Sequence, residues 1–500
     1  MVCLRVRGCG ASETLASLRS SVESANACTL PGCSIKFDSF LPVLRRAQSR
    51  GYVKDHEAEY VATGLMQGFT LGVDIKAMQK LGKRAFRNYP SSLAAHSSVT
   101  KAVQRRVERG KTVNLGKARE ALVDLHAAHD AFVVFPMGAV PKPNQSPDLP
   151  ASEVEYRPTD DHTRTRLNAH TIMGILGHSL NTYKEVEWLL KTGYFLRVSD
   201  VEDAFLLIPL HPDLWLFMLF RWACDGEGAD EDLLAHLFAD FGTKGAPGTF
   251  QLLMVRVVVQ MARSEMILTL DLVVYVDDAG IIGEDRVKCD VEMLQLQDWS
   301  WQTCGVPWKR PKDKAAAIPQ YYIGFWWNSL THTRSLDESK LAKYLFELSE
   351  AGQSASLTLR ERQSLAGKVQ RAIMTMPPGA ACLLVNCYLM MSRLTLPWHA
   401  RRTSKAERDD YKFVHDVLRY NVGSGYYTYS GFSDGPTVLS DASKSRAYTG
   451  GGYVESSGFY DFWSYGASAS RKPIDYLEGD VVVEVRASRV AVLGVAVLCL

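Results

Sequence analysis

The sequence has few of the features that mark proteins stabilised by structural metal ions or disulfide bonds. Its ten cysteines are scattered over 500 residues, and no two of them form a CxxC pair. The closest pairs, Cys28 with Cys33 and Cys382 with Cys387, have no matching histidine or cysteine group nearby. No zinc knuckle or finger is therefore expected. Free buried thiols in a reducing compartment are the simpler interpretation.

Long apolar runs are also missing. The first residues lack the continuous hydrophobic core of a signal peptide, and the apolar residues 490–500 are too few to cross a bilayer. We therefore expect an intracellular protein, cytoplasmic or nuclear, that is not secreted and has no membrane partner. The sequence also has no internal repeat and no long low-complexity tract.

The chain has almost no net charge. Its 57 Lys and Arg residues against 55 Asp and Glu residues give +2 at pH 7. A nucleic-acid partner would therefore have to be met by local basic patches. The hydrophobic content of 46% is that of a globular protein, and 500 residues are too many for one core. We expect three or four modules.

Two apolar runs flank a pair of adjacent carboxylates within residues 272–282. The β-branched residues on both sides predict a β-hairpin with Tyr275-Val276-Asp277-Asp278 at its turn. Carboxylates this close repel each other unless a cation neutralises them, and magnesium is the usual ion for such hard oxygen ligands. Successive strand residues point to opposite faces, so Asp277 and Asp278 should not bind a metal equivalently. On the hairpin alone, an exposed acidic turn is the simpler interpretation.

A further carboxylate ends another predicted strand upstream. Residues 195–198 have strand character, and Asp200 follows them. A carboxylate there, beside a strand tipped with Asp277, gives a site for two metal ions. Phosphoryl transfer requires such a site, because one ion lowers the pKa of an attacking hydroxyl and the other holds the leaving phosphate oxygens.

Three ordered motifs resemble the palm of a reverse transcriptase. They are Asp200-x-x-x-Ala204-Phe205 with Ile208-Pro209, then Phe241-Gly242-x-x-x-Ala246-Pro247-x-x-Phe250, and then Tyr275-x-Asp277-Asp278. Each motif alone is weak, but the three together are specific. The resemblance is closer to LTR-type retrotransposon enzymes, especially the DIRS-like group, than to retroviral ones. It runs from about Phe132 to the C-terminus.

This resemblance implies an α+β fold built as a right-hand polymerase. Such a polymerase has fingers, a palm with an antiparallel sheet and a helical thumb, and here a partial ribonuclease H-like α/β domain would follow. The expected domains are an N-terminal helical region of unknown role (1–114), fingers and palm (115–334), thumb and connection (335–430) and the partial ribonuclease H-like domain (431–500). The basic run 101–111 is predicted to be helical. We interpret it as a solvated helix face, with template contact as the alternative.

The resemblance also implies roles for single residues. Asp200, Asp277 and Asp278 would be the catalytic residues and would bind two Mg²⁺ ions, with Mn²⁺ as an alternative. Lys142 and Arg157 would hold the incoming triphosphate, since Arg offers phosphate a planar fork and Lys a mobile point charge. The alternative for Arg157 is an ion pair with a nearby acid.

Three further residues are expected to contact the nucleotide. Phe205 would clash with a 2′-hydroxyl and so reject ribonucleotides, although a core phenylalanine is the alternative. Pro247 is expected to start a helix beneath the templating pair, because proline costs little in a first turn. Tyr275 would complete the nucleotide site.

Three regions further along have weaker signals. Gly324 and Trp326 lie in an aromatic strand pair, residues 321–327, that would hold the primer, although core packing explains these aromatics equally well. Lys309, Arg310, Lys312 and Lys314 form a basic cluster that would contact a nucleic-acid backbone. Asp441 and Glu478 match the first two acids of a ribonuclease H site. No Asp or Glu follows Glu484, so we expect a truncated domain of doubtful activity.

These features predict an RNA-directed DNA polymerase of a retroelement that adds deoxynucleotides to a primer 3′-hydroxyl. Its expected partners are an RNA or DNA template with primer and deoxynucleoside triphosphates, with no small-molecule cofactor. The alternative is a decayed or recruited retroelement protein that binds nucleic acid without catalysis. An unrelated α/β binding protein is disfavoured, because the three motifs occur in order.

Overall fold

The computed structural model describes residues 10–24, 30–142, 145, 149, 153–172, 182–375 and 384–420, together with the strands 424–426, 438–444, 449–455 and 460–464. For those last four strands it describes the backbone alone. The chain divides into two compact units, residues 1–186 with 194–323, and residues 187–193 with 324–500.

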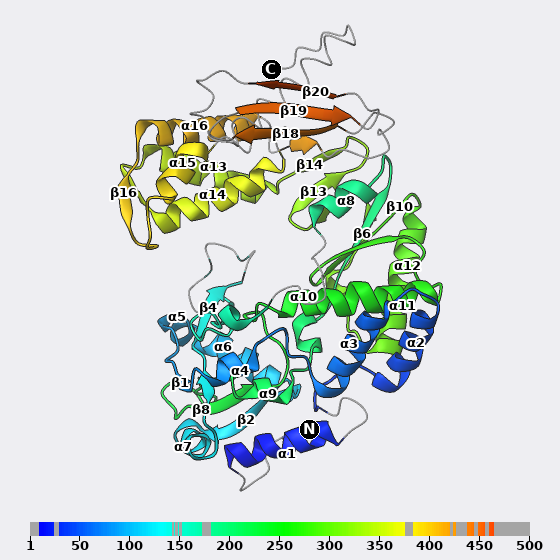
Figure 1. Cartoon of the computed structure of the whole chain (residues 1–500), viewed down its shortest axis with the longest axis vertical. Coiled ribbons are helices and arrows are strands. Elements are labelled where there is room, and N and C mark those ends of the chain that lie inside the picture. The colour runs from blue at the N-terminus through cyan, green and yellow to red at the C-terminus, as the bar shows by residue number, and fades with distance from the viewer. Residues whose placement is uncertain are drawn as a thin grey trace. The chain divides into compact units, whose positions relative to one another are not determined.

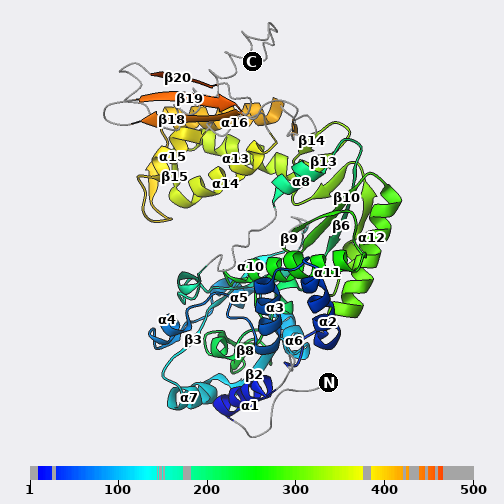
Figure 2. The same cartoon turned by 45° about the vertical axis from the view of Figure 1, so that its right-hand side comes forward.

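A four-stranded antiparallel sheet organises the first unit, in the order β11-β6-β10-β9. Its strands are β6 (Phe195–Asp200), β9 (Asp271–Tyr275), β10 (Asp278–Gly283) and β11 (Lys314–Ala317). Helix α12 (Arg286–Trp299) lies against β6, β10 and β11 (Figures 1 and 2). The carboxylate of Asp285 caps this helix by accepting from the Lys288 N–H. The predicted hairpin and the predicted strand that ends at Asp200 are confirmed.

A five-stranded sheet in the order β1-β3-β7-β8-β2 forms the other half of this unit. Its strands are β1 (Lys83–Ala85), β2 (Thr112–Lys117), β3 (Phe132–Val134), β7 (Leu219–Trp222) and β8 (Asp232–His236). Helix α6 (His96–Glu108) buries Val99 and Val103 in a cluster with Phe220 and Trp222 of this sheet. The strands β4 (Met137–Pro141) and β5 (Tyr156–Asp160) form a separate antiparallel pair.

A continuous helical run joins the two sheets in sequence. It consists of α10 (Ala246–Gln251), the π-helix η3 (Leu252–Val258) and α11 (Val259–Ser264). Pro247 lies in the first turn of α10, as predicted, where its missing N–H costs little. Helices α2 (Phe37–Ser49) and α3 (Asp55–Gln67) contact α11 and η3 respectively.

The remaining elements before residue 324 are short or peripheral. They are α1 (Ala11–Glu23), α4 (Ile75–Gln79), α5 (Pro90–Ala94), α7 (Ala118–Ala128), η1 (Asn168–His170), α8 (Tyr183–Leu189), η2 (Ala204–Leu207), α9 (Pro212–Trp215), η4 (Ser300–Cys304), η5 (Arg310–Lys312) and β12 (Gln320–Tyr322). One hydrophobic core extends from Ala11 to Ala316. The expected domain boundary between residues 114 and 115 falls inside β2, and both sides of it contribute to that core.

The second unit contains the helices expected after residue 335. They are α13 (Glu338–Gln353), α14 (Leu359–Ile373), α15 (Val385–Met391) and α16 (Lys405–Tyr420), and α16 contacts α13 and α15. A capping box starts α14: Thr358 accepts from the Glu361 N–H and Glu361 accepts from the Thr358 N–H. Arg362 and Glu407 form a fully buried ion pair between α14 and α16, with Nε and Oε1 2.7 Å apart.

Small sheets complete this unit. The strands are β13 (Phe325–Asn328), β14 (Thr333–Ser335), β15 (Ser356–Thr358), β16 (Ala400–Arg402), β17 (Ser424–Tyr426), β18 (Val438–Lys444), β19 (Thr449–Glu455) and β20 (Tyr460–Ser464). The last three form an antiparallel meander in the order β18-β19-β20 (Figure 1). Across the described residues of the chain, no helix has both the length and the apolar character needed to span a membrane.

Candidate active site

The turn of the β9–β10 hairpin carries two of the three predicted catalytic aspartates. Tyr275 pairs with Asp278, which leaves Val276 and Asp277 as the two turn residues. Val276 has φ of 55°, a left-handed conformation that two-residue hairpin turns require but that a β-branched residue seldom adopts. The turn therefore fixes the position of Asp277 relative to Asp278.

Two buried side chains from neighbouring elements support this hairpin. The Tyr322 hydroxyl donates to the carbonyl of Val273 at 2.9 Å and to that of Asp278 at 3.0 Å. From α10, the Gln251 amide donates to the Val274 carbonyl at 3.0 Å. These bonds fix both strands of the hairpin from inside the unit.

Asp200 lies directly opposite Asp278 across the β6–β10 ladder. The backbone N–H of Val201 also donates to the Asp277 carbonyl at 2.8 Å, which ties the end of β6 to the turn. Residues directly opposite in an antiparallel pair have Cβ atoms about 5 Å apart. The fold thus brings Asp200 to the hairpin that carries Asp277 and Asp278, which follow it by 77 and 78 residues in sequence, as the resemblance implied.

Burial and carboxylate repulsion both raise the pKa of the two hairpin aspartates. Burial, together with the negative charge of Asp277 and Asp200, raises the pKa of Asp278 to about 6. Burial and the charge of Asp200 also raise the pKa of Asp277. A group of carboxylates with raised pKa values stabilises a bound cation, because the cation removes both the desolvation cost and the repulsion.

Lysines from the basic cluster lie beside Asp200. The Lys312 ammonium is 3.2 Å from Oδ2 and the Lys309 ammonium is 3.9 Å from Oδ1, an oxygen that is buried and accepts no hydrogen bond. Lys309 and Lys312 thus pair with a carboxylate in this structure, and their contact with a nucleic-acid backbone stays a prediction. The unsatisfied Asp200 oxygen and the all-oxygen ligand set fit a hard divalent cation.

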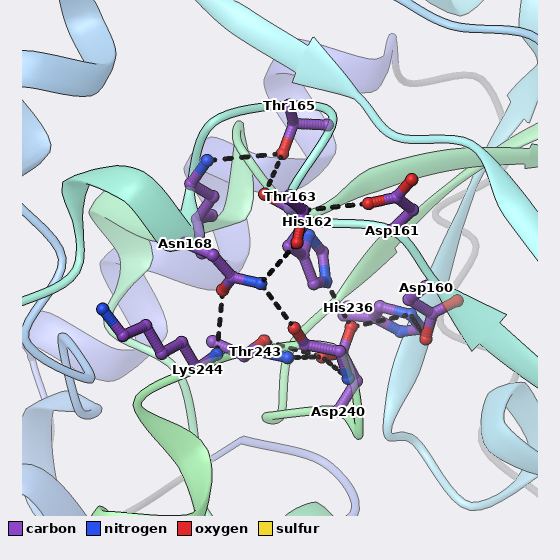
Figure 3. A network of polar contacts seen from close by, with 12 residues as sticks. Asp160, Asp161, His162, Thr163, Thr165, Asn168, His236, Asp240, Thr243 and Lys244 are labelled. Carbon is purple, nitrogen blue, oxygen red and sulfur yellow. Dashed lines mark hydrogen bonds and ion pairs between the residues drawn. The ribbon is translucent and has the colours of Figure 1, made fainter. Parts of the chain in front are cut away.

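A second polar cluster lies in the first unit, and Figure 3 shows it. Asp160, His236 and Asp240 are the one group in the described part of the chain whose ligand atoms all lie within 4.8 Å of one another. However, the Arg106 guanidinium lies 3.4 Å from Asp160 and 3.5 Å from His236, and His162 is 2.7 Å from Asp240. Protein cations already occupy the positions around these acids, so the cluster is an ion-pair network and a poor metal site.

The network controls the charge of its buried members. Burial alone would lower the pKa of His162, but the adjacent Asp240 carboxylate raises it above its ordinary value. Burial would likewise raise the pKa of Asp240, but His162 and the Thr243 hydroxyl lower it. The ion pair joins the segment after β5 to the segment that contains Phe241, because Asp240 immediately precedes that residue.

A cavity of about 320 Å³ opens beside Asp277. Its lining residues come from α6, the β4–β5 pair, the turn after β6 and the loop before β11. They are Ser98, Lys101, Ala102, Arg105, Arg106, Arg109, Lys142, Glu155, Tyr156, Arg157, Pro158, Val201, Asp203, Ala204, Leu206, Phe241, Asp277, Lys309 and Lys312. Cationic side chains outnumber acidic ones in this list. The cavity is therefore suited to a small anionic ligand.

Both predicted triphosphate ligands line this cavity. Lys142 is 2.5 Å from the Glu155 carboxylate, and both side chains are solvent-exposed. Arg157 is exposed and places its guanidinium 5.6 Å from the centre of the Phe241 ring. No ion pair of Arg157 is recorded among the described residues, so the alternative interpretation, a loop-stabilising ion pair, has no support here.

The three other predicted nucleotide contacts differ in exposure. Phe205 is only 5% exposed and belongs to the hydrophobic core, and its ring contacts that of Phe241 at a centroid distance of 4.9 Å. Phe241, rather than Phe205, lines the cavity and is 49% exposed. Pro247 is half-buried in α10, and Tyr275 is exposed at the hairpin turn.

The remaining predicted site residues belong to the second unit. Gly324 has φ of 88° and precedes β13, and an added Cβ would collide with the Arg371 side chain. Trp326 is 40% exposed in β13. Asp441 lies in β18 opposite Gly452, and Glu478 lies outside the described residues.

The sequence analysis did not predict that α6 forms part of the cavity wall. The basic run around Arg105 was interpreted as a solvated face, yet residues of this helix line the cavity. A usable signal was present, because the cations Lys101, Arg105 and Arg109 recur every four residues and so share one helix face. Only the tertiary structure shows what that face lines.

Comparisons with known proteins support the fold. No protein-family model matches the sequence, and no curated protein matches it. Solved structures do match: a foamy viral protease-reverse transcriptase in complex with double-stranded DNA has a TM-score of 0.52 at 14% identity, over 91% of this chain and 72% of that one. The same viral protein in complex with an RNA/DNA hybrid gives 0.51 at 13% identity, over 91% and 55% of the two chains. A further complex with double-stranded DNA gives 0.51 at 12%, over 90% and 86%. The chain therefore has a reverse-transcriptase-like fold.

Proposed function

We propose that this chain is an RNA-directed DNA polymerase of a retroelement, of the LTR-type or DIRS-like kind. The observation that carries the proposal is the pairing of Asp200 with Asp278 across the β6–β10 ladder, with Asp277 in the adjoining turn. The reverse-transcriptase-like fold supports it, since the neighbours of that fold are complexes with DNA or with an RNA/DNA hybrid. The proposed partners are a primed RNA or DNA template and deoxynucleoside triphosphates.

In this proposal the first unit supplies fingers and palm. The β4–β5 pair and α6 act as fingers, and the β11-β6-β10-β9 sheet acts as the palm. The helices α13 to α16 of the second unit act as a thumb and connection. The meander β18-β19-β20 supports a ribonuclease H-like segment, in which Asp441 would be one acid.

Asp200 and Asp277 would hold two Mg²⁺ ions with Asp278 in support, and these ions would activate the primer 3′-hydroxyl and neutralise the leaving phosphate oxygens. The protein's own residues bind and orient the substrate. Lys142 and Arg157 neutralise the triphosphate where charge builds during transfer. The Phe241 ring packs against the Arg157 guanidinium, and the Phe205 ring packs edge-on against Phe241.

The test is primer extension on a poly-rA/oligo-dT duplex with Mg²⁺. The wild-type chain should extend the primer, and Asp277→Asn should abolish extension. Asp271→Asn is the matched control, because it removes an exposed carboxylate from the same hairpin, on strand β9. Extension that survives Asp277→Asn would contradict the assignment of the site.

A second candidate function follows from Lys312. This lysine and Lys309 place positive charge beside Asp200, which offsets part of the repulsion among the three carboxylates and would do so in a protein that only binds nucleic acid. A folded wild-type chain that binds the duplex but extends no primer with Mg²⁺ or Mn²⁺ would favour this decayed or recruited binder.

A further inference from the structure

One face of α6 lines the cavity beside Asp277. The lining residues are Ser98, Lys101, Ala102, Arg105, Arg106 and Arg109, and their spacing of three or four residues follows a single helix face. The small residues Ser98 and Ala102 leave room between the cations. On the other side of the helix, Val99 and Val103 are fully buried and fix its rotation.

The cations on this face fall into two kinds. Arg106 pairs with the buried Asp160, and Arg109 pairs with Asp203 at 2.5 Å. Lys101 and Arg105 are exposed to the cavity, and no ion pair of either is recorded in the part of the chain that the structure describes. Positive charge that lines a concave surface raises the local concentration of anions there.

An internal anion already lies among these cations. The Glu155 carboxylate contacts Lys142 at 2.5 Å. Its pKa is lowered mainly by this contact with Lys142, and the positive charges of Lys101 and Arg105 lower it further. Glu155 is exposed, so an incoming ligand can displace its side chain without unfolding the unit.

We propose that Lys101 and Arg105 of α6 bind the β- and γ-phosphates of the incoming nucleoside triphosphate, and that Glu155 occupies this position until the triphosphate displaces it. This inference rests on the proposed polymerase function. It extends the polyphosphate site from the β4–β5 pair to a helix that precedes it in sequence.

Two features favour a polyphosphate over the backbone of a nucleic-acid strand. The cavity volume of about 320 Å³ lies in the range of sites for small ligands. Asp277 lines the same cavity, so a polyphosphate bound there lies beside a carboxylate that the proposed reaction uses. Arg109 has a positioning role, because its ion pair with Asp203 holds α6 against the turn after β6.

The experiment measures tripolyphosphate binding to the full chain by isothermal titration calorimetry, without nucleic acid. The double variant Lys101→Gln/Arg105→Gln should weaken binding at least about tenfold, because charge-assisted hydrogen bonds to phosphate are lost. Glu155→Gln should tighten binding, because the competing internal anion is removed. The charge-matched control is Lys80→Gln/Arg87→Gln, which removes two exposed cations away from the cavity and should leave affinity unchanged.

Equal affinity of the wild type and the Lys101/Arg105 double variant would overturn the proposal, and so would a wild type that binds no tripolyphosphate. Unchanged tripolyphosphate binding with a weaker, less salt-dependent affinity for duplex would assign α6 to the strand backbone and overturn it as well. If the wild type extends primers, the double variant should raise KM for the nucleotide about tenfold and preserve kcat. Loss of tripolyphosphate binding in the variant, in a chain that extends no primer, would support the anion site while rejecting the polymerase.

Discussion

Asp278 and Asp200 are direct partners across the β6–β10 ladder, although 77 residues separate them in sequence. Their carboxylates, with that of Asp277, form one negative group, and burial together with neighbouring carboxylate charge raises the pKa of Asp277 and of Asp278. The group is therefore a source of instability in the free protein and a source of affinity for a cation. Stability measurements can separate these two consequences.

Asp278→Asn should stabilise the metal-free chain at neutral pH. Because the folded-state pKa of Asp278 is raised to about 6 from an ordinary 3.8, its protonated form favours folding, and that contribution is lost as pH rises from about 4 to about 6. In EDTA at pH 7.5, we expect the variant to gain on the order of 2 kcal/mol in unfolding free energy. Thermal or urea unfolding from pH 4 to pH 8 measures the difference.

Adding Mg²⁺ or Mn²⁺ should make the wild type more stable than Asp278→Asn, the reverse of the order expected in EDTA. The wild type should gain stability with metal, and Asp278→Asn should gain less, because one carboxylate is missing from the group. Asp271→Asn, a control on the same hairpin, should behave as the wild type. A wild type whose unfolding is unaffected by millimolar metal would contradict a cation site at these aspartates.

His162→Gln should destabilise the chain in a pH-dependent way. The folded-state pKa of His162 is raised by Asp240, so its stabilising charge is present below about pH 6.5 and is lost as pH rises through the folded-state value. We expect a loss of about 2 kcal/mol at pH 6 that shrinks toward pH 9. His56→Gln, an exposed histidine on α3, is the control. An equal loss at both pH values would show that only packing was affected.

Tyr322→Phe should loosen the catalytic hairpin. The variant removes the hydroxyl that donates to the Val273 and Asp278 carbonyls and leaves both buried acceptors without that donor. We expect a loss of about 1–2 kcal/mol in unfolding free energy and a lower kcat in primer extension. Tyr52→Phe, at an exposed tyrosine, should change neither quantity. Faster hydrogen exchange in β9 and β10 would locate the effect, and an unchanged hairpin would contradict the role given to Tyr322.

Phe241→Leu should weaken nucleotide binding with little change in stability. The exposed Phe241 ring lies under the Arg157 guanidinium, an arrangement that contributes about 1 kcal/mol at partly exposed sites. We expect KM for the nucleotide to rise about fivefold with kcat nearly unchanged. Phe346→Leu replaces another exposed phenylalanine, in the second unit, and serves as the control. A rise in KM for both variants would rule out a specific effect.

Local features of the sequence determined the secondary structure at the site. β-Branched residues predicted the hairpin around Asp277, the strand character of residues 195–198 predicted the strand before Asp200, and proline chemistry predicted the start of α10. Each of these depends on contacts within a few residues, which the sequence order already contains. The grouping of Asp200, Asp277 and Asp278 was predicted only from the resemblance of three ordered motifs.

The tertiary structure alone decided what each surface faces. Phe205 and Phe241 are both aromatic residues in motifs, yet packing buries Phe205 in the core and leaves Phe241 on the cavity wall. The basic face of α6 and the lysines beside Asp200 acquire their partners through strands and loops that are about 90 to 110 residues away in sequence. Charge and hydrophobic patterns show that a helix face is polar, but they do not specify which distant carboxylate or cavity the folded chain brings against it, and that choice depends on long-range packing.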